Sequence, residues 1–302
     1  MLIGALEVGG TNVIASIGNP QRGVMQRASF ATAAPQETIK QVVSFFKVFE
    51  IKALGIGAFG PLDLNPASKT YGYITDTPKE EWQNYPLLPT LRDALNVPTQ
   101  IDTAVNAAAL AENRAGAGKG TKNMLYVTGG SGIGGGLLIG GVPVHGLVHP
   151  ELGHMIITPL AQDSMPDGVC PFHKHCLEGL AGSVAMEKRW GLPPKLMTQD
   201  HPAWTLEAAY LSQMCANAIL MLSPEIIVLG GEVMQQNPAL YPMIRERTLR
   251  LLGGYVASER MTAEGMEKYI VPPQLGINAG VTGALLLGAR ALEMHEREES
   301  AL

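Results

Sequence analysis

The sequence lacks an excess of basic residues. Its 22 Lys and Arg stand against 27 Asp and Glu, which gives a formal net charge of −5. A basic surface is what attracts the phosphates of nucleic acids. The charge balance therefore argues against a nucleic-acid partner.

Long apolar runs are also absent. Runs such as 226–229 are far shorter than the roughly 20 residues that a helix needs to cross a bilayer. The first residues do not combine a basic segment with a long apolar stretch, which is the pattern of a secretion signal. We therefore expect no membrane partner and no export.

Cysteine is scarce, with three residues in the whole chain. That number is too small for a disulfide framework, and Cys170 and Cys176 lie in a short segment that also contains His residues. The pattern indicates a reducing compartment and a metal, so we expect a cytoplasmic protein.

What the chain does have is length and apolar content. It has 302 residues, of which 46% are hydrophobic and 16% charged, so it is long enough and apolar enough for two compact domains. Each half opens in the same way, with an apolar run, a glycine-rich turn and a second apolar run. The runs are 2–7 and 13–17 in the first half and 124–128 and 137–139 in the second. This predicts two similar α/β domains facing each other across a cleft.

The small-residue segment 115–120 marks the expected boundary between the domains. Other expected elements come from apolar spacing and composition. They are a helix over 38–49, a strand over 53–56, a helix that begins with 106–112, a strand over 226–229, and a final helix through Met294 with a charged, frayed tail.

The two glycine turns are suited to phosphate. Gly9, Gly10 and Thr11 form the first, and residues 128–132 form the second. Glycine lets backbone N–H groups approach an anion closely, and hydroxyls add donors. A single such turn is weak support, but one at the start of each half favours a bound nucleotide. Neither turn is a Walker loop or a dinucleotide fingerprint.

A second group of residues has the spacing of a metal site. Cys170, His173 and Cys176 form a Cys-x2-His-x2-Cys segment, and His154 can complete a tetrahedron for zinc. Four protein ligands leave no open position, so the ion would be structural. His175 is a competing ligand or a bystander, and an unmetallated loop is the alternative.

Two acidic residues accompany this segment. Glu151 precedes His154, and Glu178 follows Cys176. Carboxylates on stiffened segments are apt partners for sugar hydroxyls, because they accept charge-assisted hydrogen bonds in fixed directions. Either residue alone would more simply be a solvated acid.

Together these segments resemble the ROK sugar kinases of the actin-like ATPase superfamily, and among them the chain is similar to the bacterial zinc-containing fructokinases. The resemblance runs nearly end to end, and its most specific parts are His-Pro-Glu-Leu-Gly-His over 149–154 and the metal segment. The matching segments are 7–11, 55–63, 102–112, 149–154, 170–176 and 228–234.

The resemblance implies a fold of two ribonuclease H-like, actin-like ATPase domains around a cleft. The first domain would comprise 1–114, completed by a C-terminal helix at about 283–302. The second would comprise 115–282 and carry the zinc loop. The resemblance also implies a homodimer, and Mg²⁺ with the ATP.

Residue roles follow from the same resemblance. The ATP phosphates would contact Gly9, Gly10, Thr11, Asn12, Thr128, Gly130, Ser131 and Gly132, with Gly230 and Gly231 near the adenosine. The sugar would contact Gly60, Thr103, Asn106, Glu151 and Glu178. Structural zinc would be held by His154, Cys170, His173 and Cys176.

Four positions depart from the family pattern. Ala104 stands where the family has the aspartate that acts as general base, and Asn12 stands where a Lys is common. The Gly-Thr-Gly turn becomes 130–132 with Ser131, and the Pro of a later motif is missing from 181–185. Asp102 is a weak substitute for the base: if its segment is extended, positions 102 and 104 point the same way.

The predicted function is therefore a fructokinase-type transfer of the ATP γ-phosphate to the 6-hydroxyl of fructose. Loss of a positioned base costs ~10²–10⁴-fold in rate, so activity is expected to be impaired or redirected. An inactivated or engineered variant is one interpretation of Ala104. The alternative is a catalytically silent sugar-binding or regulatory protein. A zinc hydrolase is disfavoured by the closed ligand set.

Overall fold

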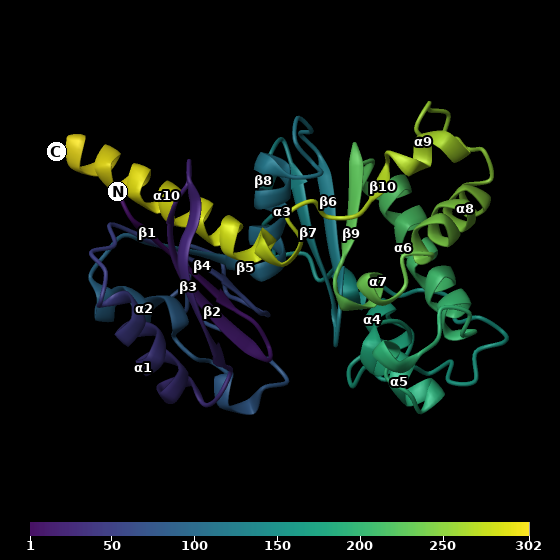
Figure 1. The fold of residues 1–302 in the computed structure, drawn as a ribbon, viewed down its shortest axis with the longest axis horizontal. Coiled ribbons are helices and arrows are strands. Elements are labelled where there is room, and N and C mark those ends of the chain that lie inside the picture. Colours follow the sequence, from purple (N-terminus) through teal and green to yellow (C-terminus); the bar gives the residue numbers. More distant parts are fainter. Residues whose placement is uncertain (302) are drawn as a thin grey trace. The chain divides into compact units, whose positions relative to one another are not determined.

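The computed structural model describes residues 1–301, which form two compact units (Figure 1). The first unit contains Met1–Ala115, Val142–Pro150 and the chain from Leu275 onward. The second contains Gly116–Gly141 and Glu151–Gln274. Both units combine helices with a sheet, so the predicted α/β class is confirmed.

The sheet of the first unit has the strand order β3-β2-β1-β4-β5. Its strands are β1 (Ile3–Val8), β2 (Asn12–Asn19), β3 (Gly23–Ala31), β4 (Leu54–Ala58) and β5 (Thr99–Thr103). β1, β4 and β5 run parallel, whereas β2 and β3 form an antiparallel meander at one edge. Because parallel strands end at the same edge of a sheet, the segments that follow β1, β4 and β5 gather there.

Helices cover both faces of this sheet. They are α1 (Pro35–Phe46), α2 (Leu87–Leu95), α3 (Ala104–Ala115) and α10 (Ala279–Ser300), with two 3₁₀ turns, η1 (Glu80–Trp82) and η4 (Gly276–Asn278), and the short strand β8 (Val142–Pro143). Alternate side chains of β1 point to opposite faces. Leu6 packs in the core with α1 and α2, and Ile3 packs against Leu285 of α10.

The last helix lies directly against the helix that begins after β5. A Cβ on Gly283 of α10 would lie 1.8 Å from the carbonyl oxygen of Ala107 in α3, so only glycine allows this approach. In Figure 1, α10 is the yellow helix that runs along the sheet of the purple N-terminal strands. The C-terminal helix α10 therefore belongs to the same unit as the N-terminal strands.

The sheet of the second unit contains the strands β10, β9, β6 and β7, in that spatial order. They are β6 (Met124–Gly129), β7 (Ile133–Ile139), β9 (Ile226–Gly230) and β10 (Ile270–Val271). β6 pairs antiparallel with β7 and parallel with β9. The carboxyl ends of β6 and β9 therefore lie side by side, which places the second glycine turn beside the loop after β9.

The helices of the second unit are mostly short. They are α4 (Leu177–Leu180), α5 (Ser183–Trp190), α6 (Ala203–Leu222), α7 (Glu232–Gln236), α8 (Leu240–Leu252) and α9 (Ala263–Glu267), with the 3₁₀ turns η2 (Leu152–His154) and η3 (Pro194–Leu196). The exceptions are α6 and α8, which pack against each other, and α6 buries Trp204 and Tyr210 almost completely. None of the helices within residues 1–301 is both long and apolar enough to cross a membrane.

Two predictions about the ends of elements were wrong. The tail after Met294 was expected to fray, but α10 continues to Ser300, and within it Nε2 of His295 lies 3.3 Å from a carboxylate oxygen of Glu299, one turn further on. The first helix spans Pro35–Phe46 rather than 38–49, because Pro35 is favoured at a helix start. Leu302 lies outside the described residues.

A third correction concerns residues 142–150. They were expected in the second domain, but they belong to the first unit. Side-chain contacts fix them there: His145 lies 3.1 Å from a carboxylate oxygen of Asp102, and His149 accepts a hydrogen bond from the Leu62 N–H at 3.0 Å.

Candidate functional site

The first glycine turn connects β1 to β2, and two hydrogen bonds from Thr32 hold it in place. The Thr32 hydroxyl donates to the carbonyl of Gly9 at 2.8 Å, and its N–H donates to the carbonyl of Thr11 at 2.9 Å. A Cβ on Gly9 would lie 2.7 Å from the carbonyl oxygen of Asn12, so glycine is required there. Gly10, Thr11 and Asn12 are exposed, which leaves their backbone accessible to an anion.

A lysine that the sequence analysis did not single out lies beside this turn. The Cε atom of Lys79 is 3.7 Å from the position that a Cβ on Gly10 would take. Lys79 comes just before η1, about 70 residues along the chain, so no local spacing could reveal it. An ammonium group at a glycine turn adds charge to the backbone donors that an anion would meet.

The junction between β5 and α3 is built around Asp102. One oxygen of this carboxylate accepts from the Thr103 N–H and from the Asn106 side-chain amide, both at 2.7 Å. The Thr103 hydroxyl in turn accepts from the Asn106 N–H at 3.1 Å, so it caps the start of α3. All three residues are buried, with Asp102 only 3% exposed.

This geometry corrects one premise of the sequence analysis. Asp102 lies in a strand and Ala104 begins a helix, so the rule that alternate residues point the same way does not apply to them. The carboxylate of Asp102 is turned to its neighbours and not toward solvent. In contrast, the side-chain oxygen of Asn106 has no hydrogen-bond partner among the described residues. A donor from a ligand or a water molecule would satisfy that oxygen.

Two histidines of the segment Val142–Pro150 complete the junction. The ring Nε2 of His145 lies 3.1 and 3.2 Å from the two oxygens of Asp102, and this contact raises the pKa of His145. His149 is buried, and its burial lowers the pKa. A neutral His149 ring suits its role as acceptor for the Leu62 N–H, which fixes the loop that contains Gly60.

The second glycine turn, between β6 and β7, is closed by a hydrogen bond from the Gly130 N–H to the Gly132 carbonyl at 2.8 Å. Ser131 at its tip is exposed. The loop after β9 packs against the start of this turn: a Cβ on Gly231 would lie 2.3 Å from the Gly129 carbonyl and 2.7 Å from the Thr128 hydroxyl. The predicted phosphate turn and the predicted adenosine segment are therefore in contact within the second unit.

The two acidic residues lie near each other and near this turn. The Glu178 carboxylate accepts from the Ile133 N–H at 2.9 Å, and it would lie 2.4 Å from a Cβ on Gly132. Glycine at 132 therefore makes room for the acid. Burial raises the pKa of Glu151 to about 7, and the negative charge of Glu178 contributes to the rise.

A fully buried carboxyl group lies behind the turn. One oxygen of Glu207 accepts from the Gly182 N–H at 3.1 Å, and the neighbouring Ser183 N–H donates to the Gly130 carbonyl at 2.8 Å. The other oxygen of Glu207 has no partner among residues 1–301, and burial raises its pKa to about 7. No motif points to Glu207, which is an isolated acid within the apolar helix α6.

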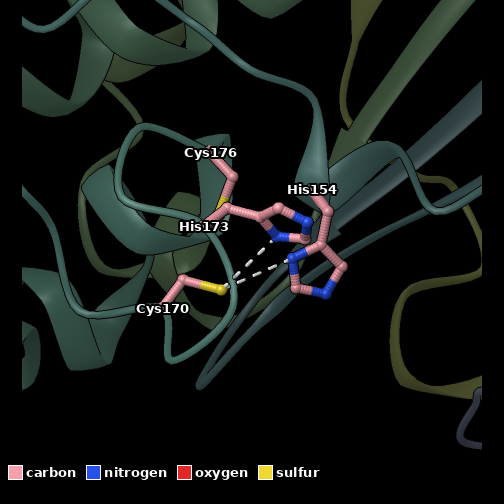
Figure 2. Close-up of side chains that lie close together, drawn as sticks. All are labelled: His154, Cys170, His173 and Cys176. Carbon is pink, nitrogen blue, oxygen red and sulfur yellow. Dashed lines mark hydrogen bonds between the residues drawn. The ribbon is translucent and has the colours of Figure 1, made fainter.

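The four predicted metal ligands are brought together by η2, the following loop and α4 (Figure 2). The ligand atoms of His154, Cys170, His173 and Cys176 all lie within 4.8 Å of one another. The Cys170 sulfur is 3.7 and 3.8 Å from the Nδ1 atoms of the two histidines. Two thiols and two imidazoles in this arrangement fit a tetrahedral ion with no open position.

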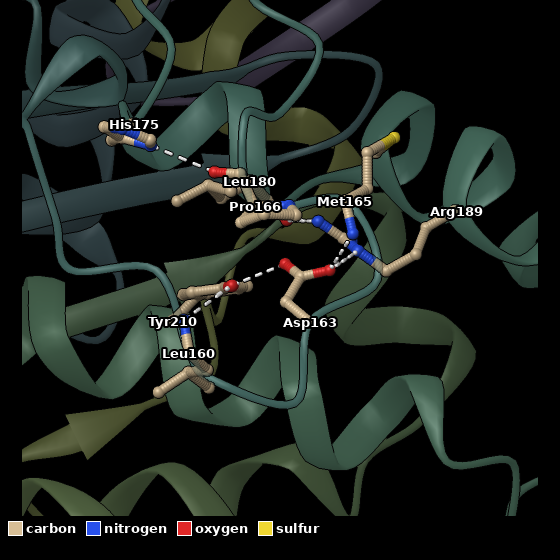
Figure 3. Close-up of polar contacts among 8 residues, drawn as sticks. All are labelled: Leu160, Asp163, Met165, Pro166, His175, Leu180, Arg189 and Tyr210. Carbon is tan, nitrogen blue, oxygen red and sulfur yellow. Dashed lines mark hydrogen bonds and ion pairs between the residues drawn. The ribbon is translucent and has the colours of Figure 1, made fainter.

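His175 does not join this cluster. Its ring nitrogen lies 2.9 Å from the carbonyl oxygen of Pro166. Figure 3 shows the ring at this carbonyl, on the loop that leads toward Asp163. Of the two roles left open for His175, competing ligand or bystander, the structure favours the bystander.

The same loop is anchored by a buried ion pair (Figure 3). Asp163 lies 2.7 Å from Nε of Arg189 and accepts from the Tyr210 hydroxyl at 2.5 Å. Arg189 also donates to the carbonyl of Leu180, the last residue of α4, at 2.8 Å. Burial alone would raise the pKa of Asp163, but bonds from Tyr210, the Met165 N–H and Arg189 together hold it below its usual range.

Comparisons with known proteins show what the whole chain is similar to. The chain is 39% identical to a fructokinase of Pediococcus pentosaceus over 293 residues, which is 97% of this chain and 99% of that one. It is 39% identical to a fructokinase of Lactococcus lactis subsp. cremoris, over 92% of this chain and 93% of the other. A crystal structure of the ROK hexokinase from Thermus thermophilus superposes with a TM-score of 0.77 at 26% identity, covering 97% of this chain and all of that one.

The sequence profile of the ROK family matches residues 3–291, which include both glycine turns, the β5–α3 junction and the Cys/His cluster. The chain belongs to the ROK family.

Proposed function

We propose that this chain is an ATP-dependent sugar kinase of the fructokinase type, which transfers the γ-phosphate of ATP to the 6-hydroxyl of fructose. The observation that carries the proposal is 39% identity, over nearly the whole chain, to proteins named fructokinase. A silent regulatory protein is not favoured, because these relatives are named as enzymes.

In this proposal the glycine turns hold the phosphates of ATP. The exposed backbone of Gly10–Asn12 and the turn that carries Ser131 supply N–H and hydroxyl donors. Lys79, beside Gly10, supplies the positive charge that Asn12 lacks. Gly231 lies against the second turn, Gly230 pairs with Thr128 between β9 and β6, and both would contact the adenosine. Phosphoryl transfer depends mainly on such positioning and on charge neutralisation, to which Mg²⁺ would contribute.

We assign the binding of the sugar hydroxyls to polar groups that can still form hydrogen bonds. The unpartnered oxygen of Asn106 suits a hydroxyl donor. The loop at Gly60 is held in position because His149 accepts a hydrogen bond from the Leu62 N–H. Glu151 and Glu178 would accept from further hydroxyls. Thr103 contributes indirectly, because its own hydroxyl caps α3.

We propose Zn²⁺ as the ion of the Cys/His cluster, held by His154, Cys170, His173 and Cys176. The donor set supports this choice, since thiolates and imidazoles prefer zinc to magnesium or calcium. When bound, the ion would cross-link the loop that precedes Glu178. It would take no part in phosphoryl transfer, because all four positions come from the protein.

Two further properties belong to the proposal. We place the protein in the cytoplasm, which suits its free cysteines Cys170, Cys176 and Cys215. We also expect a homodimer, a prediction that rests on the family resemblance and that sedimentation equilibrium would test.

The proposal is tested by measuring ATP turnover on a panel of hexoses led by fructose, with sugar binding measured by calorimetry on the same preparation. The matched variant is Ala104→Asp, which restores a carboxylate at the start of α3. We expect fructose to bind to both proteins and the variant to turn over faster. If neither protein binds or phosphorylates any hexose, the proposed function is wrong.

A further inference from the structure

The position assigned to the general base holds Ala104, yet a base stands close by. His145 is a 40% exposed side chain whose Nε2 is fixed by the buried carboxylate of Asp102. Asp102 is two residues before Ala104 and accepts from Asn106 as well, so ring, carboxylate and amide form one hydrogen-bonded group at the start of α3. We propose that His145 is the catalytic base of this chain and that Asp102 is its positioning residue.

This inference rests on the proposed function, because it concerns the same phosphoryl transfer. The arrangement is that of a histidine–carboxylate pair, in which a buried acid orients the imidazole through one nitrogen and leaves the other nitrogen to take a proton. Nε2 of His145 faces Asp102, and Nδ1 has no partner among the described residues. Nδ1 is therefore the atom available to a substrate hydroxyl.

The other groups at the junction are less suited to this role. The Asp102 carboxylate already accepts from the Thr103 N–H and from Asn106 and is turned inward. His149 is 4% exposed, and its Nε2 is committed to the Leu62 N–H. His145 is the group that combines exposure with a fixed orientation and a titratable nitrogen.

The reaction balances with ATP as the phosphoryl donor. Nδ1 takes the proton from the 6-hydroxyl as that oxygen bonds to the γ-phosphorus. The bond from the γ-phosphorus to the β–γ bridging oxygen breaks, and its electron pair stays on the departing ADP. The imidazolium, stabilised by Asp102, then releases its proton to water.

Several charged groups set the protonation of His145. The Asp102 carboxylate on β5 raises its pKa most, through the hydrogen bond and the charge. Partial burial and the positive charge of Arg290 on α10 oppose this rise. His149 and Tyr71 are the other titratable neighbours, since His149 interacts with both His145 and Asp102, and Tyr71 with Asp102. The neutral ring is the active form, so kcat should rise with pH as His145 deprotonates.

The test is a double-mutant cycle on the full chain with fructose and ATP. The four proteins are the present chain, His145→Gln, Ala104→Asp, and the combination of both changes. Gln keeps a side-chain donor for Asp102 but cannot act as a base. In the present chain we expect His145→Gln to lower kcat by about 10²-fold or more with KM little changed. In the Ala104→Asp background we expect a change within about a factor of three, because the new carboxylate takes over.

Three further measurements separate a base from a structural contact. Imidazole added to His145→Gly should restore part of the lost kcat, whereas a structural role would give no rescue. The pH dependence of kcat should follow the His145 ring, titrated by NMR, in the present chain, and it should disappear in His145→Gln. His295→Gln, a change of an exposed histidine near the C-terminal end of α10, is the matched control and should leave turnover unchanged.

Three outcomes would overturn the inference while leaving the kinase assignment intact. The present chain could be inactive while Ala104→Asp is active, His145→Gln could be as active as the present chain, or its loss could be equal in both backgrounds. If Ala104→Asp neither binds nor phosphorylates a hexose, the proposed function itself fails, and this inference fails with it.

Discussion

The candidate sites of the two units are held in place by different chemistry. In the second unit, a Cys/His cluster and a buried ion pair fix the loop around Glu178. In the first unit, the β5–α3 junction is held by neutral and charge-assisted hydrogen bonds around Asp102. In the second unit the site depends on an ion pair and, if the proposed Zn²⁺ binds, on that ion, whereas in the first unit it depends on the protonation of histidines. The two sites should therefore fail under different conditions.

The largest effect is expected at the Cys/His cluster. Removing the ion with a chelator, or changing Cys176→Ser, should release the loop before α4 and lower the melting temperature and the metal content together. Structural zinc contributes on the order of 10 kcal/mol to folding in small domains, and part of that should appear here. Calorimetry and metal analysis give the result. Cys215→Ala, a buried cysteine outside the cluster, should keep the metal; equal metal loss in both variants would contradict the assignment.

The next effect is expected at the buried ion pair. Arg189→Met leaves the Asp163 charge without its main partner in a site where both side chains are at most 2% exposed. Breaking such a pair costs about 3–5 kcal/mol. Denaturant unfolding measures the loss. Asp163→Asn with Arg189→Met, which removes both charges, should cost less than the single change, and an equal cost would argue against an unpaired charge as the cause.

A smaller effect is expected at the first glycine turn. Lys79→Met should raise KM for ATP by about tenfold to a hundredfold with kcat little changed, because a hydrogen bond to a charged group contributes about 1.5–3 kcal/mol. Steady-state kinetics over an ATP series measure it. Lys69→Met, an exposed lysine of the same region, is the control. If KM is unchanged in Lys79→Met, Lys79 does not contact the phosphates of ATP.

The smallest effect is expected from His149. Burial lowers the pKa of His149 in the folded chain, so the unfolded chain binds the proton more readily. Its contribution to stability is complete above the ordinary histidine pKa of about 6.5 and is lost as the pH falls below that value and through the lowered pKa of the folded chain. Urea midpoints between pH 8 and pH 5.5 give the slope. His149→Gln should flatten the slope in this range, and an unchanged slope would mean that other groups cause it.

Local patterns in the sequence predicted the parts of the fold that are local. The strands around Gly9 and around Gly130 follow from short apolar runs that end in glycine, and the Cys/His cluster follows from three ligands within seven residues. Contacts between distant segments could not be predicted in this way. Lys79 meets Gly10, and His145 meets Asp102, only because the fold brings together segments about 70 and 40 residues apart.

The same limit explains the errors. Residues 142–150 follow directly on β7 in sequence, so the sequence assigns them to the second domain, but His145 and His149 bond to groups of the first unit. Residues 295–300 of the charged tail include no apolar residue, so the tail does not show the spacing of a packed helix. It is nevertheless helical to Ser300, because glutamate and arginine favour helix and the polar pair of His295 and Glu299, one turn apart, supports it.

The position of α10 has a consequence for the order in which the chain is made. The face of β1 that carries Ile3 and Ala5 is covered by Ala284 and Leu285, which a ribosome adds about 280 residues later. The second unit lies wholly between these segments in sequence and can fold first. The apolar face of β1 therefore stays uncovered until the last helix has been synthesised. During synthesis this face is exposed to aggregation and needs protection.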